Sequence, residues 1–204
     1  MIVFRAAGED EANFCAGLIR ETEGALADAL FGLGDPQRAL RALAHFYRRR
    51  GSLYSREIVE VAEAEGQALG ILIGYTPEEE RRRVRGMLGG MLTFYGLGDT
   101  LRVIRRGMAG FNLHDGDPGD WVIANVAVSE AARNRGVGRA MMLHAEERAR
   151  QAGCRRTTLL VRWGNPARRL YDALGYQPLA EYDDERLERV LKVAGFTWMG
   201  KGLK

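Results

Sequence analysis

The sequence is poor in the residues that build disulfide frameworks and metal centres. It has two cysteines, Cys15 and Cys154, and three histidines among 204 residues, so we expect neither a disulfide-stabilised fold nor a zinc site. No apolar run approaches the ~20 residues that span a bilayer. The first residues also lack a basic stretch followed by an apolar core and a cleavage site. We therefore expect no metal, no membrane span and no secretory signal, and a reduced cytoplasmic compartment.

Proline is also scarce, with five residues, whereas hydrophobic residues make up 46% of the chain and charged residues 28%. This composition is typical of a globular domain and not of a disordered chain. The length suits one well-cored domain, and the sequence contains neither internal repeats nor a Pro/Gly-rich linker. We therefore predict a single domain over residues 1–204.

The net charge of +3 is distributed unevenly. Residues 129–171 carry ten arginines and three glutamates, whereas the chain outside this stretch and residues 76–106 is acidic. An evenly spread phosphate-binding surface would not leave so much of the chain acidic, so we expect no nucleic-acid partner. The local basic stretch fits a compact polyanion better. The acidic remainder favours a cationic second substrate.

Hydrophobic periodicity predicts a mixed α/β domain. Asp35-Pro36 supplies an N-cap followed by proline at the first helical position, and WVIANVAV (Trp121–Val128) is typical of a strand buried on both faces. Glu146 and Arg150 are spaced for an ion pair on the exposed side of a helix. The predicted elements are an N-terminal strand, helices from residue 9 and on both sides of Gly24, a helix over 36–49, a hairpin over 58–75, helices over 135–152, 165–174 and 184–193, and strands over 121–128, 157–163, 177–182 and 196–203.

Residues 76–120 are predicted to form a helical insertion. Thr76-Pro77-Glu78-Glu79 supplies a capping box and acidic residues at the helix N-terminus. Gly86 and Gly90 lie one helical turn apart and would let another helix approach closely. That helix belongs either to the same domain, on which the insertion would form a cap, or to a second copy in a homodimer; an interfacial helix pair is the third alternative. The acidic loop with His114 is either solvated or part of an acceptor site.

The turn after the strand that ends in Val126, Ala127 and Val128 carries the chemistry. In the run from Arg133 to Arg139, Gly136 and Gly138 have no β-carbon, so consecutive backbone N–H groups are accessible where a helix starts. These donors and the helix dipole favour phosphate oxygens. A dinucleotide-binding turn would need a third glycine at the position of Met141, and no Gly-Lys-Ser/Thr follows for a nucleotide P-loop. Hydride transfer and phosphoryl transfer are therefore excluded.

Arg133-Asn134-Arg135-Gly136-Val137-Gly138 resembles the R/Q-x-x-G-x-G/A signature of the GNAT superfamily, the acyl-CoA-dependent N-acetyltransferases. The resemblance continues into Asn165 and the run LYDALGY (Leu170–Tyr176). It implies an α/β fold with a partly splayed mixed sheet flanked by helices. It also implies an acetyl-CoA-binding core at 121–182, from which the insertion at 76–120 departs.

The resemblance implies a cosubstrate and a set of roles. Acetyl-CoA would bind with its pantetheine arm along the end of the strand and its diphosphate on the N–H groups of the turn. Tyr171 would protonate the departing thiolate, and a primary amine would attack the thioester directly, without an acyl-enzyme. The cofactor-binding residues would be Val126, Ala127, Val128, Arg133, Asn134, Arg135, Gly136, Val137, Gly138, Arg139 and Asn165.

Several alternatives stay open at this point. Tyr171 also fits a core-packing stripe, and Asn165 fits a plain N-cap before proline. Members of the family often carry a glutamate where this chain has Ala124, and Glu60 and Glu63 are the nearest substitutes, so the general base stays unassigned. A non-catalytic acyl-CoA-binding regulatory module is the competing function. The acceptor amine, a small molecule or a protein amino group, is not identified by the sequence.

Overall fold

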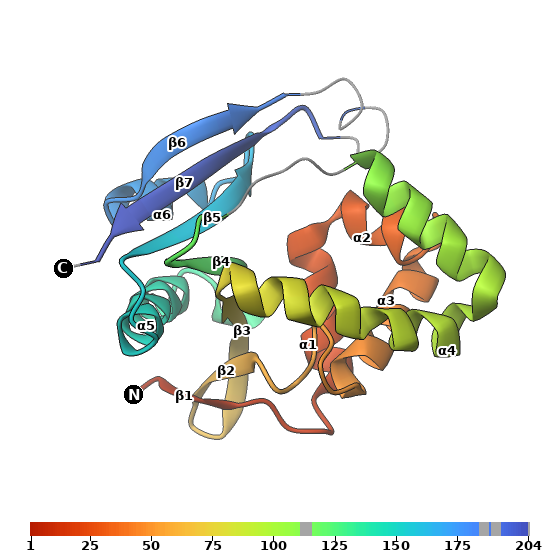
Figure 1. Cartoon of the computed structure of the whole chain (residues 1–204). Coiled ribbons are helices and arrows are strands. Elements are labelled where there is room, and N and C mark those ends of the chain that lie inside the picture. The colour runs from red at the N-terminus through yellow and green to blue at the C-terminus, as the bar shows by residue number, and fades with distance from the viewer. Residues whose placement is uncertain (111–115, 184–187, 189–192, 204) are drawn as a thin grey trace.

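The computed structural model describes residues 1–110, 116–183, 188 and 193–203 (Figure 1). Its strands form one sheet in the order β1-β2-β3-β4-β5-β7-β6. β4 and β5 are parallel, and every other neighbouring pair is antiparallel. The predicted mixed α/β fold is thus confirmed. The strands are β1 (Val3–Ala6), β2 (Val59–Ala64), β3 (Gln67–Tyr75), β4 (Asp120–Val128), β5 (Arg156–Arg162), β6 (Gln177–Tyr182) and β7 (Phe196–Gly202).

The helices begin and end at the residues that local chemistry favours. Gly24, with a φ of 60°, separates the first two helices, and Asp35 accepts a hydrogen bond from the Gln37 N–H at 2.8 Å as the N-cap of the third. The helices are α1 (Ala12–Glu23), α2 (Ala25–Leu30), α3 (Pro36–Arg48), α4 (Pro77–Gly110), α5 (Val137–Gln151) and α6 (Arg168–Ala173), with a short 3-10 turn η1 (Glu130–Ala132). The helix predicted over 184–193, apart from residues 188 and 193, and His114 lie outside the described residues.

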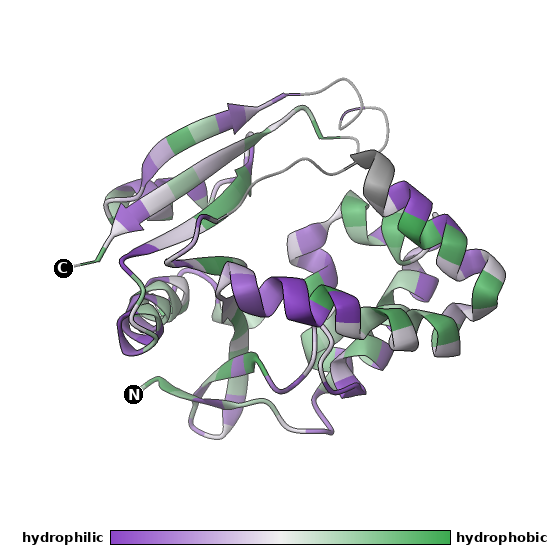
Figure 2. Ribbon diagram, in the orientation of Figure 1, coloured by the Kyte–Doolittle hydropathy of each residue, from purple (hydrophilic) through white to green (hydrophobic). Residues whose placement is uncertain are grey.

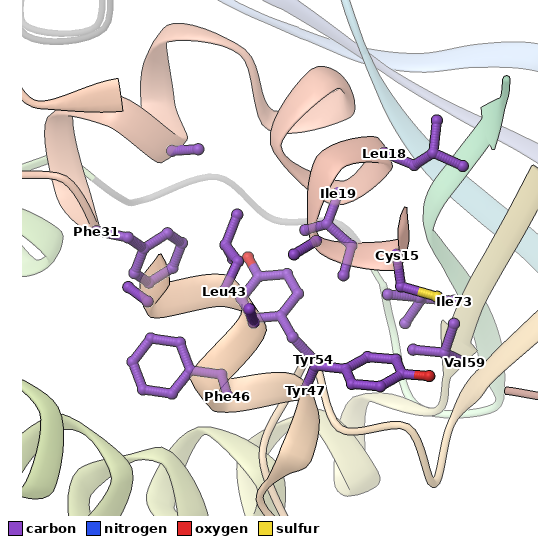
Figure 3. Close-up of a cluster of buried hydrophobic side chains, with 14 of the residues drawn as sticks. Cys15, Leu18, Ile19, Phe31, Leu43, Phe46, Tyr47, Tyr54, Val59 and Ile73 are labelled. Carbon is purple, nitrogen blue, oxygen red and sulfur yellow. The ribbon is translucent and has the colours of Figure 1, made fainter. Parts of the chain in front are cut away.

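Helices cover both faces of the sheet (Figure 1). α5 packs on β3, β4 and β5, and α1 packs on β3 and β4 from the other side. The larger core cluster lies on the α1 side, where Ile19, Leu43 and Phe46 are fully buried (Figure 3). Tyr54, from the segment between α3 and β2, lies inside this cluster. Methionines of α5 form the centre of the second cluster.

The predicted insertion contains α4, which bends at Gly96. Its small residues approach the same chain, because a Cβ on Gly86 would lie 2.3 Å from the Gly51 carbonyl oxygen and one on Gly90 would lie 3.2 Å from Phe46. The helix therefore caps its own domain. Its outer side carries exposed apolar residues, and Figure 2 shows how they interrupt its hydrophilic surface. None of the helices built by described residues combines the length and apolarity needed to cross a membrane.

β4 separates from β5 half-way along the sheet. Only Asp120, Trp121 and Val122 pair with β5. On the other edge of β4, Asn125 pairs with Ile73 and Ile123 pairs with Gly74, so Ala124 is an extra residue, a β-bulge. The expected splay is thus confirmed, and among the described residues no other strand takes the place of β5 beside the end of β4.

The ion pair predicted between Glu146 and Arg150 forms, but Lys201 is the closer partner of Glu146. Glu146 is 2% exposed, and its carboxylate accepts hydrogen bonds from Lys201 Nζ at 2.7 and 2.8 Å. The closest approach of Arg150 is 3.9 Å. The prediction that Glu146 lies on the exposed side of its helix is wrong, because β7 brings Lys201 against that side.

Candidate active site

A cleft of about 740 Å³ opens where β4 and β5 separate. Its volume is within the range of about 300–1,000 Å³ that small-molecule sites occupy. Glu21 and Thr22 of α1 lie on one side, and residues from the end of β5 to α6 lie on the other. The fold therefore forms a cleft at the end of the predicted buried strand, beside the arginine- and glycine-containing turn.

The turn after β4 presents backbone donors to this region. Asn134 and Gly136 have φ values of 60° and 78°, and Gly136 is the N-cap of α5 without a side-chain cap. The first N–H to bond back within the helix is that of Ala140, to Gly136 O at 3.0 Å. The N–H groups of residues 137–139 have no carbonyl one turn earlier in the helix to bond, which makes the helix start a site for an anion.

The structure brings together seven of the residues predicted for the site. The cleft is lined by Val126, Ala127, Val128, Arg133, Gly138, Asn165 and Tyr171. Asn134, Arg135, Gly136 and Arg139 belong to the same turn without lining the cleft. The Val137 side chain is buried in the core under α5, so its N–H is the group that remains for a ligand.

Residues 105–176 match the model of the acetyltransferase (GNAT) family. This match includes the turn, the splayed strand and Tyr171. The chain therefore contains a segment of the GNAT acetyltransferase family. It is accordingly an acyltransferase, as the motif had indicated. No curated protein sequence matches the chain significantly.

Solved structures share the GNAT fold along the whole chain. A crystal structure of an acetyltransferase is 20% identical, with a TM-score of 0.74, and the match covers 99% of this chain and 100% of the other. An N-acetyltransferase from Staphylococcus aureus Mu50 is 16% identical, with a TM-score of 0.70 and coverage of 98% and 100%. A Bacillus subtilis acetyltransferase in complex with CoA is 14% identical, with a TM-score of 0.56 and coverage of 100% and 98%.

Tyr171 lies in α6 and faces the cleft of the GNAT domain. It is partly buried, and its ring lies 6.1 Å from that of Tyr176. Burial raises the pKa of Tyr171 to about 12. The phenol is therefore protonated throughout the neutral range and can donate a hydrogen bond into the cleft.

Asn165 and Arg133 each have a partner inside the protein. Asn165 Oδ1 accepts a hydrogen bond from the Ala167 N–H at 2.9 Å, which confirms its capping role while its residue lines the cleft. Arg133 donates to the carbonyl oxygen of Val128 at 3.3 Å and forms an ion pair with Glu21. Arg133 thereby links the end of β4 to α1 across the mouth of the cleft.

The two glutamates considered from sequence lie elsewhere. Glu60 binds His144 at 2.5 Å and Arg148 at 2.9 Å, and it lines a separate cavity of about 420 Å³. Glu63 forms an ion pair with Arg5 at 2.6 Å. Neither lines the cleft between β4 and β5. Both carboxylates serve ion pairs away from the splayed strands.

Sequence reasoning missed a carboxylate beside the cleft. Glu23, the last residue of α1, accepts hydrogen bonds on Oε1 from Asn125 Nδ2 at 3.1 Å and from the Tyr54 hydroxyl at 3.2 Å. Asn125 also donates to Thr22 Oγ1 at 2.6 Å. One signal pointed to this group. Asn125 is the polar residue within the apolar run Trp121–Val128, and a buried amide requires partners.

Proposed function

We propose that the chain transfers an acetyl group from acetyl-CoA to a primary amine by direct attack on the thioester. The observation that carries this proposal is the continuity of two features: the unpaired edge of β4 runs directly into the turn with N–H donors at the start of α5. A pantetheine arm contains amides that can pair with a free strand edge, and a diphosphate is the anion that the turn favours.

In the proposed complex, Val126, Ala127 and Val128 bind the pantetheine arm through their main chain. The diphosphate lies on the N–H groups of the turn from Asn134 to Arg139, where Arg133, Arg135 and Arg139 add positive charge. Asn165 contributes from the far wall of the cleft. Tyr171 faces the thioester sulfur from α6 and donates a hydrogen bond as the carbon–sulfur bond breaks. The amine nitrogen forms the new bond to the carbonyl carbon, and CoA leaves as the thiol.

The test of this proposal combines binding with turnover. Calorimetry should detect acetyl-CoA binding, and CoA release should depend on an amine from a panel of n-butylamine, putrescine, an alanyl peptide and a lysyl peptide. Gly136→Glu should abolish the binding, because it places a carboxylate beside the N–H donors. Gly153→Glu is the matched control: Gly153 follows the other end of α5 with a φ of 73°, and a Cβ there also meets nothing within 4 Å. Equal acetyl-CoA affinity of the two variants would refute the placement.

The competing function is a non-catalytic acyl-CoA-binding regulatory module. The residue that favours it is Ala124, which offers no proton-accepting group at the bulge of β4. Under this alternative, calorimetry would detect acetyl-CoA binding while no amine in the panel accelerates CoA release. Longer acyl-CoAs, tested in the same binding assay, would then define the ligand.

The remaining partner predictions also stay proposals. A homodimer through the segment 76–120 is supported by the exposed side chains of Val84, Leu88 and Leu92, which follow one another at intervals of four residues on α4. The single-domain assignment over 1–204 and the cytoplasmic location stay predictions. The acidic balance outside the basic stretch supports a cationic acceptor.

A further inference from the structure

The carboxylate of Glu23 is held at the junction of α1 and α2 by buried partners. Its two hydrogen-bond donors, Asn125 and Tyr54, are 2% and 7% exposed, whereas Glu23 itself keeps partial contact with solvent. The Tyr54 ring is fixed within the core cluster between α1 and α3 (Figure 3). The carboxylate is therefore oriented by two buried groups, while the residue as a whole is partly exposed.

This oriented carboxylate is adjacent to the cleft between β4 and β5, although Glu23 itself is not among the lining residues. Thr22, its neighbour in the chain, lines the cleft, and so does Arg162 at the end of β5. The Arg162 guanidinium lies beside Gly24, 2.7 Å from the position a Cβ would take there. The bulge at Ala124 turns Asn125 toward α1 at the level where β4 leaves β5. Glu23 thus lies beside the splay in which the thioester is proposed to bind.

The surroundings make Glu23 more basic than an exposed glutamate. Burial raises its pKa, against the opposing effects of the hydrogen bonds from Asn125 and Tyr54 and of the Arg162 charge. Burial also raises the pKa of Tyr54 well above its ordinary value, with Glu23, Tyr75 and Glu80 acting in the same direction. Tyr54 therefore stays a hydrogen-bond donor. A carboxylate with a raised pKa is better matched to accepting a proton near neutral pH.

We propose that Glu23 is the group that accepts the proton released by the acceptor amine. This inference rests on the proposed acetyl transfer. An alkylammonium ion gives one proton to Glu23 and becomes the neutral amine, which attacks the thioester carbon. The second proton leaves the nitrogen as the amide forms and balances the thiolate that departs as the CoA thiol. Glu23 then returns its proton to solvent.

The variant Glu23→Gln tests the role with the hydrogen-bonding shape preserved, since the Gln oxygen still accepts from Tyr54. We expect kcat with n-butylamine, putrescine or the lysyl peptide to fall about 100- to 10,000-fold. The acetyl-CoA dissociation constant should stay within about twofold, because Glu23 does not line the cleft in which acetyl-CoA is proposed to bind. Glu63→Gln is the matched control. It removes a carboxylate on β2 that is paired with Arg5 of β1, and this variant should keep its activity.

Two readouts separate a catalytic role from a structural one. In the wild type, log kcat/KM should rise with a slope of about 1 at low pH and level off once Glu23 is ionised, because the protonated amine is the form that gives its proton to Glu23. Glu23→Gln can use only amine that is already neutral, so its log kcat/KM should keep rising with a slope of about 1 toward the pKa of the amine. The melting temperature of Glu23→Gln at neutral pH should equal or exceed that of the wild type, because a buried carboxylate with a raised pKa opposes folding once it is ionised.

The outcomes distinguish this inference from the function on which it rests. Amine-dependent transfer by the wild type with unchanged kcat and an unchanged pH profile in Glu23→Gln overturns the inference and leaves acetyl transfer standing. The inference is also overturned, in favour of a structural role, if Glu23→Gln has a lower melting temperature and its weaker acetyl-CoA affinity accounts for the whole loss of activity. Absence of transfer by the wild type with every amine overturns both.

Discussion

Replacing Tyr171 by phenylalanine removes the phenol that we propose faces the thioester sulfur and leaves the ring in its packing position against Tyr176. The expected size of the effect follows from the pKa of this group. Burial raises the pKa of Tyr171 to about 12, whereas an ordinary thiol has a pKa of about 8.5. Complete proton transfer from this phenol to a thiolate is therefore uphill by about 3.5 units, or about 5 kcal/mol.

A hydrogen bond to the developing charge is consequently a better description than full protonation before the carbon–sulfur bond breaks. Hydrogen bonds to charged groups contribute about 1.5–3 kcal/mol. That range corresponds to a loss of about 10- to 150-fold in kcat for Tyr171→Phe. Full general-acid catalysis would instead give losses up to about 10,000-fold. The measured factor thus decides between a donor that stabilises the leaving sulfur and one that delivers its proton early.

The assay follows CoA release at saturating acetyl-CoA and amine, with acetyl-CoA affinity measured separately by calorimetry. We expect the affinity of Tyr171→Phe to match that of the wild type. Because the phenol stays protonated up to a pH of about 12, the wild type should show no loss of activity between pH 8 and 9 that Tyr171→Phe lacks. An unchanged kcat, or a loss of affinity as large as the loss of kcat, would remove Tyr171 from the chemistry.

Two further predictions concern the fold. Leu88→Glu, which places a charge at an exposed apolar position of α4, should convert a homodimer into a monomer in sedimentation experiments, and a monomeric wild type would contradict the predicted dimer. Lys201→Met should lower the free energy of unfolding in urea by about 3 kcal/mol, because it leaves the buried Glu146 carboxylate without its 2.7 Å partner. The double variant Lys201→Met/Glu146→Gln should recover part of the lost free energy of unfolding. If it recovers none, the loss comes from the packing of the Lys201 side chain and not from the unpaired carboxylate.

Local signals in the sequence were enough to predict the strands and helices that build the cleft. Asp35 and Pro36 set the start of α3, and the apolar run Trp121–Val128 became β4 within one residue. The turn from Arg133 to Arg139 was recognised because its glycines and its position between a strand and a helix are adjacent in the chain. Each of these features depends on neighbours within a few residues, which is the range over which a single sequence carries clear information.

The groups missed in the sequence are brought together over long distances. Glu23 and Asn125 are 102 residues apart, and neither belongs to a motif. Their meeting depends on α1 crossing β4 and on the bulge that turns Asn125 toward that helix. Lys201 reaches Glu146 in the same way, through the docking of β7 beside β5. Periodicity assigned Glu146 to a solvent-facing side because it contains no information about which strand will cover that side.

The bulge at Ala124 connects the two halves of the proposed site. An extra residue in β4 reverses which side chains face α1, so Asn125 points to Glu23 while Val126 returns to the α5 side. β4 and β5 have already separated at this level, so the backbone edge from Val126 to Val128 is available for a pantetheine arm. The bulge therefore directs Asn125 to Glu23, the proposed proton acceptor, next to the backbone edge that is proposed to bind acetyl-CoA. Moving the bulge by one residue would exchange the faces and separate the two functions, because side chains alternate along a strand.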